Sequence, residues 1–146
     1  LRALLEALAD DLAAAGQPVT LLPGAELRVA ARPAALRRIV GNLAGNALRH
    51  GGGARLSLEA APGGGALVHV DDDGPGIPPD RLPHALRPWV QLGGAGGGHG
   101  LGLAIAHDLA ERDGARLSLA NRDGGGLRAT LWLPPVPIVS APTNSG

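Results

Sequence analysis

The segment GNLAGNALRH, residues 41–50, places Asn42, Asn46 and Arg49 at positions i, i+4 and i+7. If this segment is helical, the three polar side chains share one face. Asparagine is a mediocre helix former, and paired amides on a helix are most often solvated or capping groups. The alternative is a binding site: a carboxamide oxygen is a hard, neutral ligand that suits Mg²⁺, and an arginine one turn later can reach a phosphate oxygen.

The segment VDDDGPGIP, residues 70–78, ends an apolar strand with three carboxylates and enters a glycine-containing loop. Adjacent like charges repel, so a folded chain that keeps Asp71–Asp73 together should supply partners for them. An aspartate beside glycines is most often a turn former. A buried carboxylate can instead accept a hydrogen bond from the exocyclic amine of a purine, while glycines let the backbone close around a flat ring.

The segment GGAGGGHGLGLAIAH, residues 93–107, has alternating glycines at Gly98, Gly100 and Gly102, where a helix is expected to begin. Free backbone N–H groups and a positive helix end suit phosphate there. The spacing GxGxG after a loop differs from the GxGxxG dinucleotide fingerprint, which follows a strand. A flexible, low-complexity loop is the alternative interpretation.

Composition narrows the chemistry further. The 146 residues are 45% hydrophobic and 18% charged, which is typical of one globular domain. Thirteen basic and thirteen acidic residues cancel, which argues against a surface built for nucleic acid. The chain has no cysteine and no lysine, so disulfides, thiolate chemistry, Schiff bases and a P-loop lysine are excluded.

The periodicity of apolar residues predicts the elements that position these segments. Helices are expected over 1–16, from Pro33 to about 50, and over 100–113; a short helical piece follows Pro78. Strands are expected over 17–22, 26–31, 54–60, 66–72, 115–121 and 126–133. This order predicts an α/β (α+β) two-layer sandwich, with a mixed, mainly antiparallel sheet covered on one face by three helices. We expect a domain over 1–135 and a frayed, proline-rich tail over 136–146.

With these motifs in this order, the chain resembles the catalytic ATP-binding domain of bacterial sensor histidine kinases, within the group that includes gyrase, MutL and the ATP-dependent chaperones. LRRIVGNLAGNALRHG resembles the N box of that family, VDDDGPGIPPD its G1 box and GHGLGLAIAHDLA its G2 box. ALRPWVQ is similar to the F box. The resemblance covers almost the whole domain and implies the Bergerat-type ATP-binding fold, with ATP and Mg²⁺ as cofactors.

The resemblance also implies roles for individual residues. Asp72 corresponds to the adenine-binding aspartate, Asn46 to the magnesium-holding asparagine, and Arg49 to a phosphate-binding basic residue. Asn46 and Arg49 are therefore the expected catalytic residues, Asn42 is a second polar contact, and His50 stands where a tyrosine often lies beside the nucleotide. The remaining residues expected at the nucleotide are Gly74, Gly76, Ile77, Gly98, His99, Gly100, Leu101 and Gly102.

One position separates the activities found in this family. Relatives that hydrolyse ATP resemble one another in placing a glutamate four residues before the metal asparagine; here that position is Asn42, and an amide cannot act as a general base. This favours transfer of the γ-phosphate to a neutral histidine of a dimerisation domain. The F box has Leu86 and Trp89 where phenylalanines are usual. The glycine-rich segment QLGGAGGGHG, which corresponds to the lid of the family, has no charged side chain. There are two alternatives: a nucleotide sensor that binds ATP but transfers no phosphate, and an ATPase.

The resemblance further implies partners and a location. The accepting histidine is expected on a dimerisation domain of the same protein, and a response regulator should take the phosphate onward. Similarity of the G1 and G2 boxes to osmosensor-type kinases suggests a winged-helix transcription factor in that role, with no direct nucleic-acid contact by this chain. The domain is expected in the cytoplasm, as part of a membrane-anchored homodimer in the bacterial inner membrane.

Overall fold

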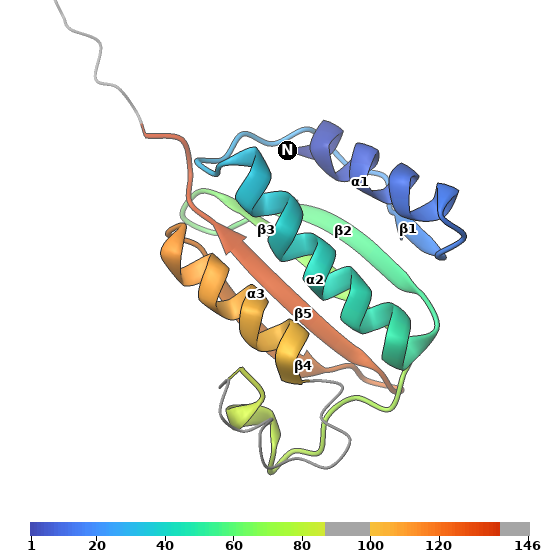
Figure 1. Cartoon of the computed structure of the whole chain (residues 1–146). Coiled ribbons are helices and arrows are strands. Elements are labelled where there is room, and N and C mark those ends of the chain that lie inside the picture. Colours follow the sequence, from blue (N-terminus) through green and yellow to red (C-terminus); the bar gives the residue numbers. More distant parts are fainter. Residues whose placement is uncertain (87–99, 138–146) are drawn as a thin grey trace, which may run out of the picture.

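The computed structural model describes residues 1–86 and 100–137 of the chain. Three α-helices lie on one face of a five-stranded sheet, so the domain has two layers (Figure 1). This confirms the predicted α/β sandwich. The elements are α1 (Arg2–Ala14), β1 (Val19–Leu21), α2 (Pro33–Gly51), β2 (Ala54–Ala60), β3 (Ala66–Asp71), the 3-10 helix η1 (Leu82–His84), α3 (Gly100–Arg112), β4 (Arg116–Asn121) and β5 (Leu127–Leu133).

Helix α2 begins and ends where the sequence predicts. Pro33 occupies its first turn, where the missing N–H has no helical acceptor and the fixed φ suits a helix. At the other end Gly52 adopts a left-handed conformation with φ of 75°, and its N–H donates to the C=O of Leu48 at 3.2 Å. The side chains that recur at helical spacing are buried against the sheet: Leu36, Ile39, Val40, Leu43 and Ala47.

The sheet has the strand order β1-β2-β3-β5-β4. β1 pairs with β2 in parallel, and the other neighbours are antiparallel. Along β5 every second side chain, from Leu127 to Leu133, is buried on the helical side. The intervening Arg128, Thr130 and Trp132 therefore point to the opposite face, which the described helices leave uncovered (Figure 1).

The prediction of a strand over 26–31 is wrong. β1 pairs in parallel with β2 at the edge of the sheet, and residues 26–31 form no strand beside it. The backbone hydrogen bond described for segment 26–31 runs from the N–H of Ala30 to the C=O of Pro134 at 2.9 Å, beyond the end of β5. Val29 and Ala31 still pack against the core. The alternation that resembles a strand therefore reflects burial without a strand partner.

Several elements end at the same side of the sandwich. Figure 1 shows the C-terminal end of α2, the chain leaving β3, the start of α3 and the turn between β4 and β5 at one end of the molecule. The pairing of Asp71 with Arg128 places the end of β3 beside the start of β5. The three motifs singled out from the sequence occupy these segments.

Candidate functional site

The three consecutive aspartates have the partners that their mutual repulsion requires. Asp71 lies opposite Arg128 on β5, whose Nε and Nη2 donate to the two carboxylate oxygens at 2.8 Å each. Asp73 accepts two hydrogen bonds from Arg55, at 2.7 and 2.9 Å, and one from Arg122 at 2.9 Å. Arginines from three other segments therefore offset the charge on either side of Asp72, as predicted.

The middle aspartate is held by the backbone. Asp72 is 3% exposed, and its Oδ1 accepts hydrogen bonds from the N–H groups of Gly74 at 2.9 Å and Leu127 at 3.2 Å. For Oδ2 the described residues supply no hydrogen bond. One oxygen thus fixes the orientation of the carboxylate, and the other remains an acceptor for a ligand.

The last turn of α2 packs directly on this loop. A Cβ atom on Gly51 would lie 2.5 Å from Cβ of Asp72, and one on Gly74 would lie 2.3 Å from the C=O oxygen of His50. Neither position can hold a larger residue unless the backbone moves. Glycine at these two positions lets the end of the N-box helix and the G1 loop meet.

The same helix end also reaches α3. A Cβ atom on Gly102 would lie 3.1 Å from Nη2 of Arg49 and 3.7 Å from the C=O oxygen of Asn42. The guanidinium of Arg49 therefore stands at the first turn of α3, where backbone N–H groups have no acceptor within the helix and the dipole is positive. Two positive groups at one place suit an anion such as a phosphate.

The two asparagines of α2 have different surroundings. Asn42 is half-buried, and its Nδ2 donates to the C=O of Arg38 at 2.9 Å. Asn46 is 2% exposed, and its Oδ1 is buried without a hydrogen-bond partner among the described residues. An unpaired buried acceptor costs about 1–3 kcal/mol. A hard, neutral oxygen held in this way fits a divalent cation that prefers oxygen ligands.

The other predicted residues are placed as follows. Ile77 is 5% exposed, and its side chain packs in the core and so anchors the G1 loop there. Gly76 has φ of +75°, a conformation that glycine adopts without strain. Gly100 and Leu101 begin α3. Gly98 and His99 lie outside the described residues, as do Trp89 and Gln91 of the F box.

Sequence reasoning missed the residues that hold the G1 loop from the β4–β5 turn. Asn121 accepts a hydrogen bond from the N–H of Ile77 at 2.9 Å and donates to its C=O at 2.7 Å. Nη1 of Arg122 donates to the C=O of Asp72 at 2.8 Å. The only local signal is the polar run Asn121–Asp123 before three glycines, which looks the same as an ordinary hairpin turn.

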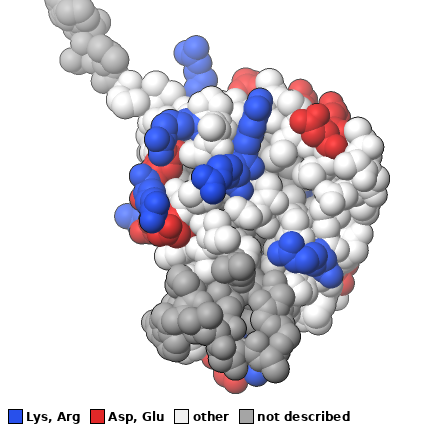
Figure 2. Space-filling model, viewed as in Figure 1, with Lys and Arg blue, Asp and Glu red and all other residues white. Residues whose placement is uncertain are grey.

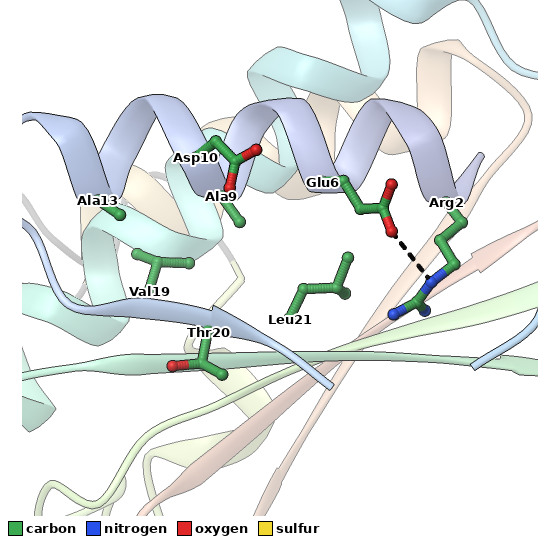
Figure 3. A pocket seen from close by; sticks show the side chains of 8 residues that line it. All are labelled: Arg2, Glu6, Ala9, Asp10, Ala13, Val19, Thr20 and Leu21. Carbon is green, nitrogen blue, oxygen red and sulfur yellow. Dashed lines mark ion pairs between the residues drawn. The ribbon is translucent and has the colours of Figure 1, made fainter. Parts of the chain in front are cut away.

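A groove of about 470 Å³ lies away from this site, between α1 and β1 (Figure 3). Arg2 and Glu6 form an ion pair at 3.5 Å at one end of it, while Ala9 and Val19 line the apolar side. The described part of the chain contains no group of three or more acidic or histidine side chains that could hold a metal ion.

The charged side chains are mixed on the helical face of the domain. Figure 2 shows arginine and acidic side chains interspersed over this face, in agreement with the formal net charge of zero. Among the described helices, none has the length and apolar character needed to cross a bilayer.

The arginines around Asp73 predict a specific acid response. Hydrogen bonds from Arg55 and then Arg122 lower the pKa of Asp73 well below its usual 3.8. Because the folded state binds this proton less readily than the unfolded chain, the stabilisation is present above about pH 4 and is lost as the pH falls further. We expect Asp73→Asn to flatten the decline of the melting temperature between pH 5 and pH 2, measured by circular dichroism. The change should be small, since the Asp73 side chain is 65% exposed.

The matched control for this acid response is Asp10→Asn on α1, an exposed carboxylate for which the described residues offer no hydrogen bond or ion pair. Its acid profile should follow that of the unaltered chain. An Asp73→Asn profile that also follows it would contradict the stabilising role of the arginine pairs.

Comparison with known proteins identifies the family. The model described as "Histidine kinase-, DNA gyrase B-, and HSP90-like ATPase" matches residues 31–137. The sensor histidine kinase GtrS of Pseudomonas aeruginosa is 45% identical over 134 residues, which cover 92% of this chain and 28% of that protein. The chain therefore belongs to the histidine kinase-, DNA gyrase B- and HSP90-like ATPase family, and it spans less than a third of the length of this relative.

Solved structures show which members of the family the chain is similar to. The ATP binding domain of PrrB from Mycobacterium tuberculosis has a TM-score of 0.74 at 30% identity, over 92% of this chain and 93% of that one. Full-length ShkA, solved in complex with AMPPNP, has a TM-score of 0.69 at 27% identity, over 93% of this chain and 30% of that one. The chain is an ATP-binding catalytic domain of the sensor histidine kinase type, which confirms the resemblance drawn from the N, G1 and G2 boxes.

Proposed function

We propose that this domain binds Mg-ATP at the end of α2 and presents the γ-phosphate to a histidine on a separate dimerisation domain. Asp72 accepts a hydrogen bond from the adenine amine through Oδ2, because Oδ1 is already occupied by backbone N–H groups. Arg49 and the first turn of α3 receive the phosphates. Gly98 and His99 complete the nucleotide contacts in this proposal, together with Gly100 and Leu101.

One observation supports this assignment above the others. The last turn of α2 touches both the buried carboxylate, through Gly51 against Asp72, and the start of α3, through Arg49 against Gly102. A single rigid helix end thus sets the separation between a purine acceptor and a phosphate-binding helix terminus. A nucleotide with base and phosphates at opposite ends fits such an arrangement.

Magnesium fits the residues present as well. The unpaired, buried Oδ1 of Asn46 is a ligand of the type that Mg²⁺ takes, and the ion would complete its shell with water and phosphate oxygens. When bound, the ion supplies charge neutralisation for the triphosphate. The amide adds no negative charge of its own, so the positive charge of the ion remains fully available to the phosphates.

The side chains near Asn46 support transfer of the phosphate rather than its hydrolysis. Asn42 lies one turn earlier, and its amide is oriented by the C=O of Arg38, so this position offers no base to deprotonate water. A neutral imidazole needs no such base in order to attack phosphorus. The domain then acts by holding and neutralising the nucleotide, and Arg49 stabilises charge on the phosphates.

The partners belong to the same proposal. The accepting histidine lies on a dimerisation domain of the complete protein, and a response regulator receives the phosphate; the osmosensor subclass and a winged-helix regulator are the finer suggestions. The relative GtrS is named a sensor histidine kinase. As the location we propose a cytoplasmic domain of a membrane-anchored dimer. A domain boundary at residue 135 and a tail over 136–146 remain predictions.

The test uses the complete cytoplasmic part of the protein and γ-³²P-ATP. We expect acid-labile, base-stable phosphohistidine to accumulate outside this domain, and we expect negligible steady-state phosphate release from the 146-residue chain alone. Continuous phosphate release by the isolated chain would favour an ATPase instead. Tight ATP binding without any phosphohistidine would favour a nucleotide sensor.

A further inference from the structure

We infer that Asn121, the last residue of β4, and Arg122, the first residue after it, are positioning residues for base recognition by the G1 loop. This inference depends on the proposed role of Asp72 and goes beyond it, because neither residue belongs to the N, G1 or G2 box. Both act on the loop that runs from Asp72 to Ile77, and neither is expected to touch the nucleotide.

Residues at the β4–β5 turn form hydrogen bonds with both ends of the G1 loop. At the first end, Nη1 of Arg122 donates to the C=O of Asp72 at 2.8 Å. The N–H of Asp72 donates to the C=O of Leu127 at 3.1 Å, and the N–H of Leu127 donates to Oδ1 of the Asp72 carboxylate at 3.2 Å. At the second end, Asn121 contacts both backbone polar groups of Ile77. A loop fixed at both ends by one rigid hairpin has little freedom to turn its carboxylate.

The chemistry of Asn121 is specific to a carboxamide. Its Oδ1 accepts from the N–H of Ile77 and its Nδ2 donates to the C=O of the same residue. A carboxylate at this position would repel that C=O oxygen, and an alanine would lose both bonds. The loop approaches so closely that a Cβ atom on Gly76 would lie 2.5 Å from Oδ1 of Asn121.

The turn itself is shaped for close approach. Gly126 has φ of +98°, and a Cβ atom there would lie 2.0 Å from the C=O oxygen of Asp72. The N–H of Arg122 donates to the C=O of Gly126 at 2.8 Å, which closes the turn. The hairpin backbone can therefore lie directly against Asp72. The N–H of Leu127, from the same hairpin, is one of the two backbone donors to Oδ1 of Asp72.

These contacts predict an effect on the choice of base. The hydrogen bond from an adenine amine to Oδ2 of Asp72 depends on the direction of the carboxylate. GTP presents an acceptor in place of that amine, so its binding makes no use of this direction. Loosening the loop should therefore weaken ATP binding selectively, whereas a general loss of folding would weaken both nucleotides together.

The experiment measures the Kd of Mg-ATP and Mg-GTP by calorimetry for the 146-residue chain and for Asn121→Asp and Asn121→Ala, well below their melting temperatures. We expect ATP affinity to fall about tenfold in both variants, as lost hydrogen bonds of ordinary strength imply, with GTP affinity changed less than about twofold. Because Asn121 is exposed, the melting temperature should fall by only a few degrees. Asp123→Asn, an exposed change in the same turn, serves as the control and should alter neither Kd.

The outcomes separate this inference from the proposed function. Equal losses of ATP and GTP affinity, or unchanged ATP affinity in both Asn121 variants, would overturn the positioning role while leaving ATP recognition by the unaltered chain intact. An unaltered chain that binds ATP and GTP equally would instead overturn the role of Asp72, and the inference would fail with it.

Discussion

Replacing Asp72 by asparagine is expected to lower the affinity for ATP about a hundredfold, equivalent to about 3 kcal/mol, while the affinity for GTP stays level or rises. In the folded domain one oxygen of this buried carboxylate is held by the N–H groups of Gly74 and Leu127. An asparagine would keep its oxygen toward those donors and turn its NH₂ group toward the base. That group faces the amine of adenine unfavourably but can donate to the carbonyl oxygen of guanine.

The matched control for Asp72→Asn is Asp71→Asn. It removes the same charge one residue earlier, but the Asp71 carboxylate binds Arg128 on the uncovered face of the sheet. Calorimetry with both nucleotides should show an unchanged ATP-to-GTP ratio for this control. If Asp72→Asn lowers both affinities equally, Asp72 is a structural residue and adenine must be recognised elsewhere.

Local patterns predict the helices and most strands of this fold because their signals are contained within each segment. The apolar spacing of α2, its proline at the start and its glycines at the end are sufficient to place it. Segment 26–31 has the same kind of alternation as a strand, yet it forms none. The difference is non-local: the N–H of Ala30 donates to the C=O of Pro134, a partner that the sequence near residue 26 does not encode.

In the candidate site too, local patterns identify some residues, whereas non-local contacts cannot be predicted from the sequence. Asp72, Asn46 and Arg49 are recognisable because each lies within a motif of fixed spacing. The residues that surround them cannot be recognised in this way, because the partners of the aspartate triplet come from β2, β5 and the β4–β5 turn. Asn121 is the clearest case: its amide binds a backbone that only the strand order β3-β5-β4 brings near it. Backbone recognition by a side chain leaves no pattern in either segment alone.

Replacing Asn46 by leucine is expected to stabilise the nucleotide-free domain and at the same time to abolish the magnesium dependence of ATP binding. The Oδ1 of Asn46 is buried without a partner among the described residues, so its removal relieves a cost of about 1–3 kcal/mol. Leucine has the same number of side-chain heavy atoms, branched at the same carbon, and the neighbouring Leu43 and Ala47 on α2 are buried. The melting temperature should therefore rise by about 3 °C or more.

Asn46→Leu is expected to raise the stability of the free domain but to remove the magnesium dependence of ATP binding, and these opposite effects distinguish a metal ligand from a residue needed for folding. A residue kept for folding would lose stability when changed, whereas a metal ligand is retained at the expense of stability in the free domain. Thermal melting without nucleotide and calorimetry with ATP, each with and without Mg²⁺, measure the two quantities. Leu43→Ala, an apolar change on the same helix, should lower the melting temperature and leave the magnesium dependence intact. A destabilised Asn46→Leu domain that still binds ATP in a magnesium-dependent way would show that the amide serves packing and that the metal is held by other groups.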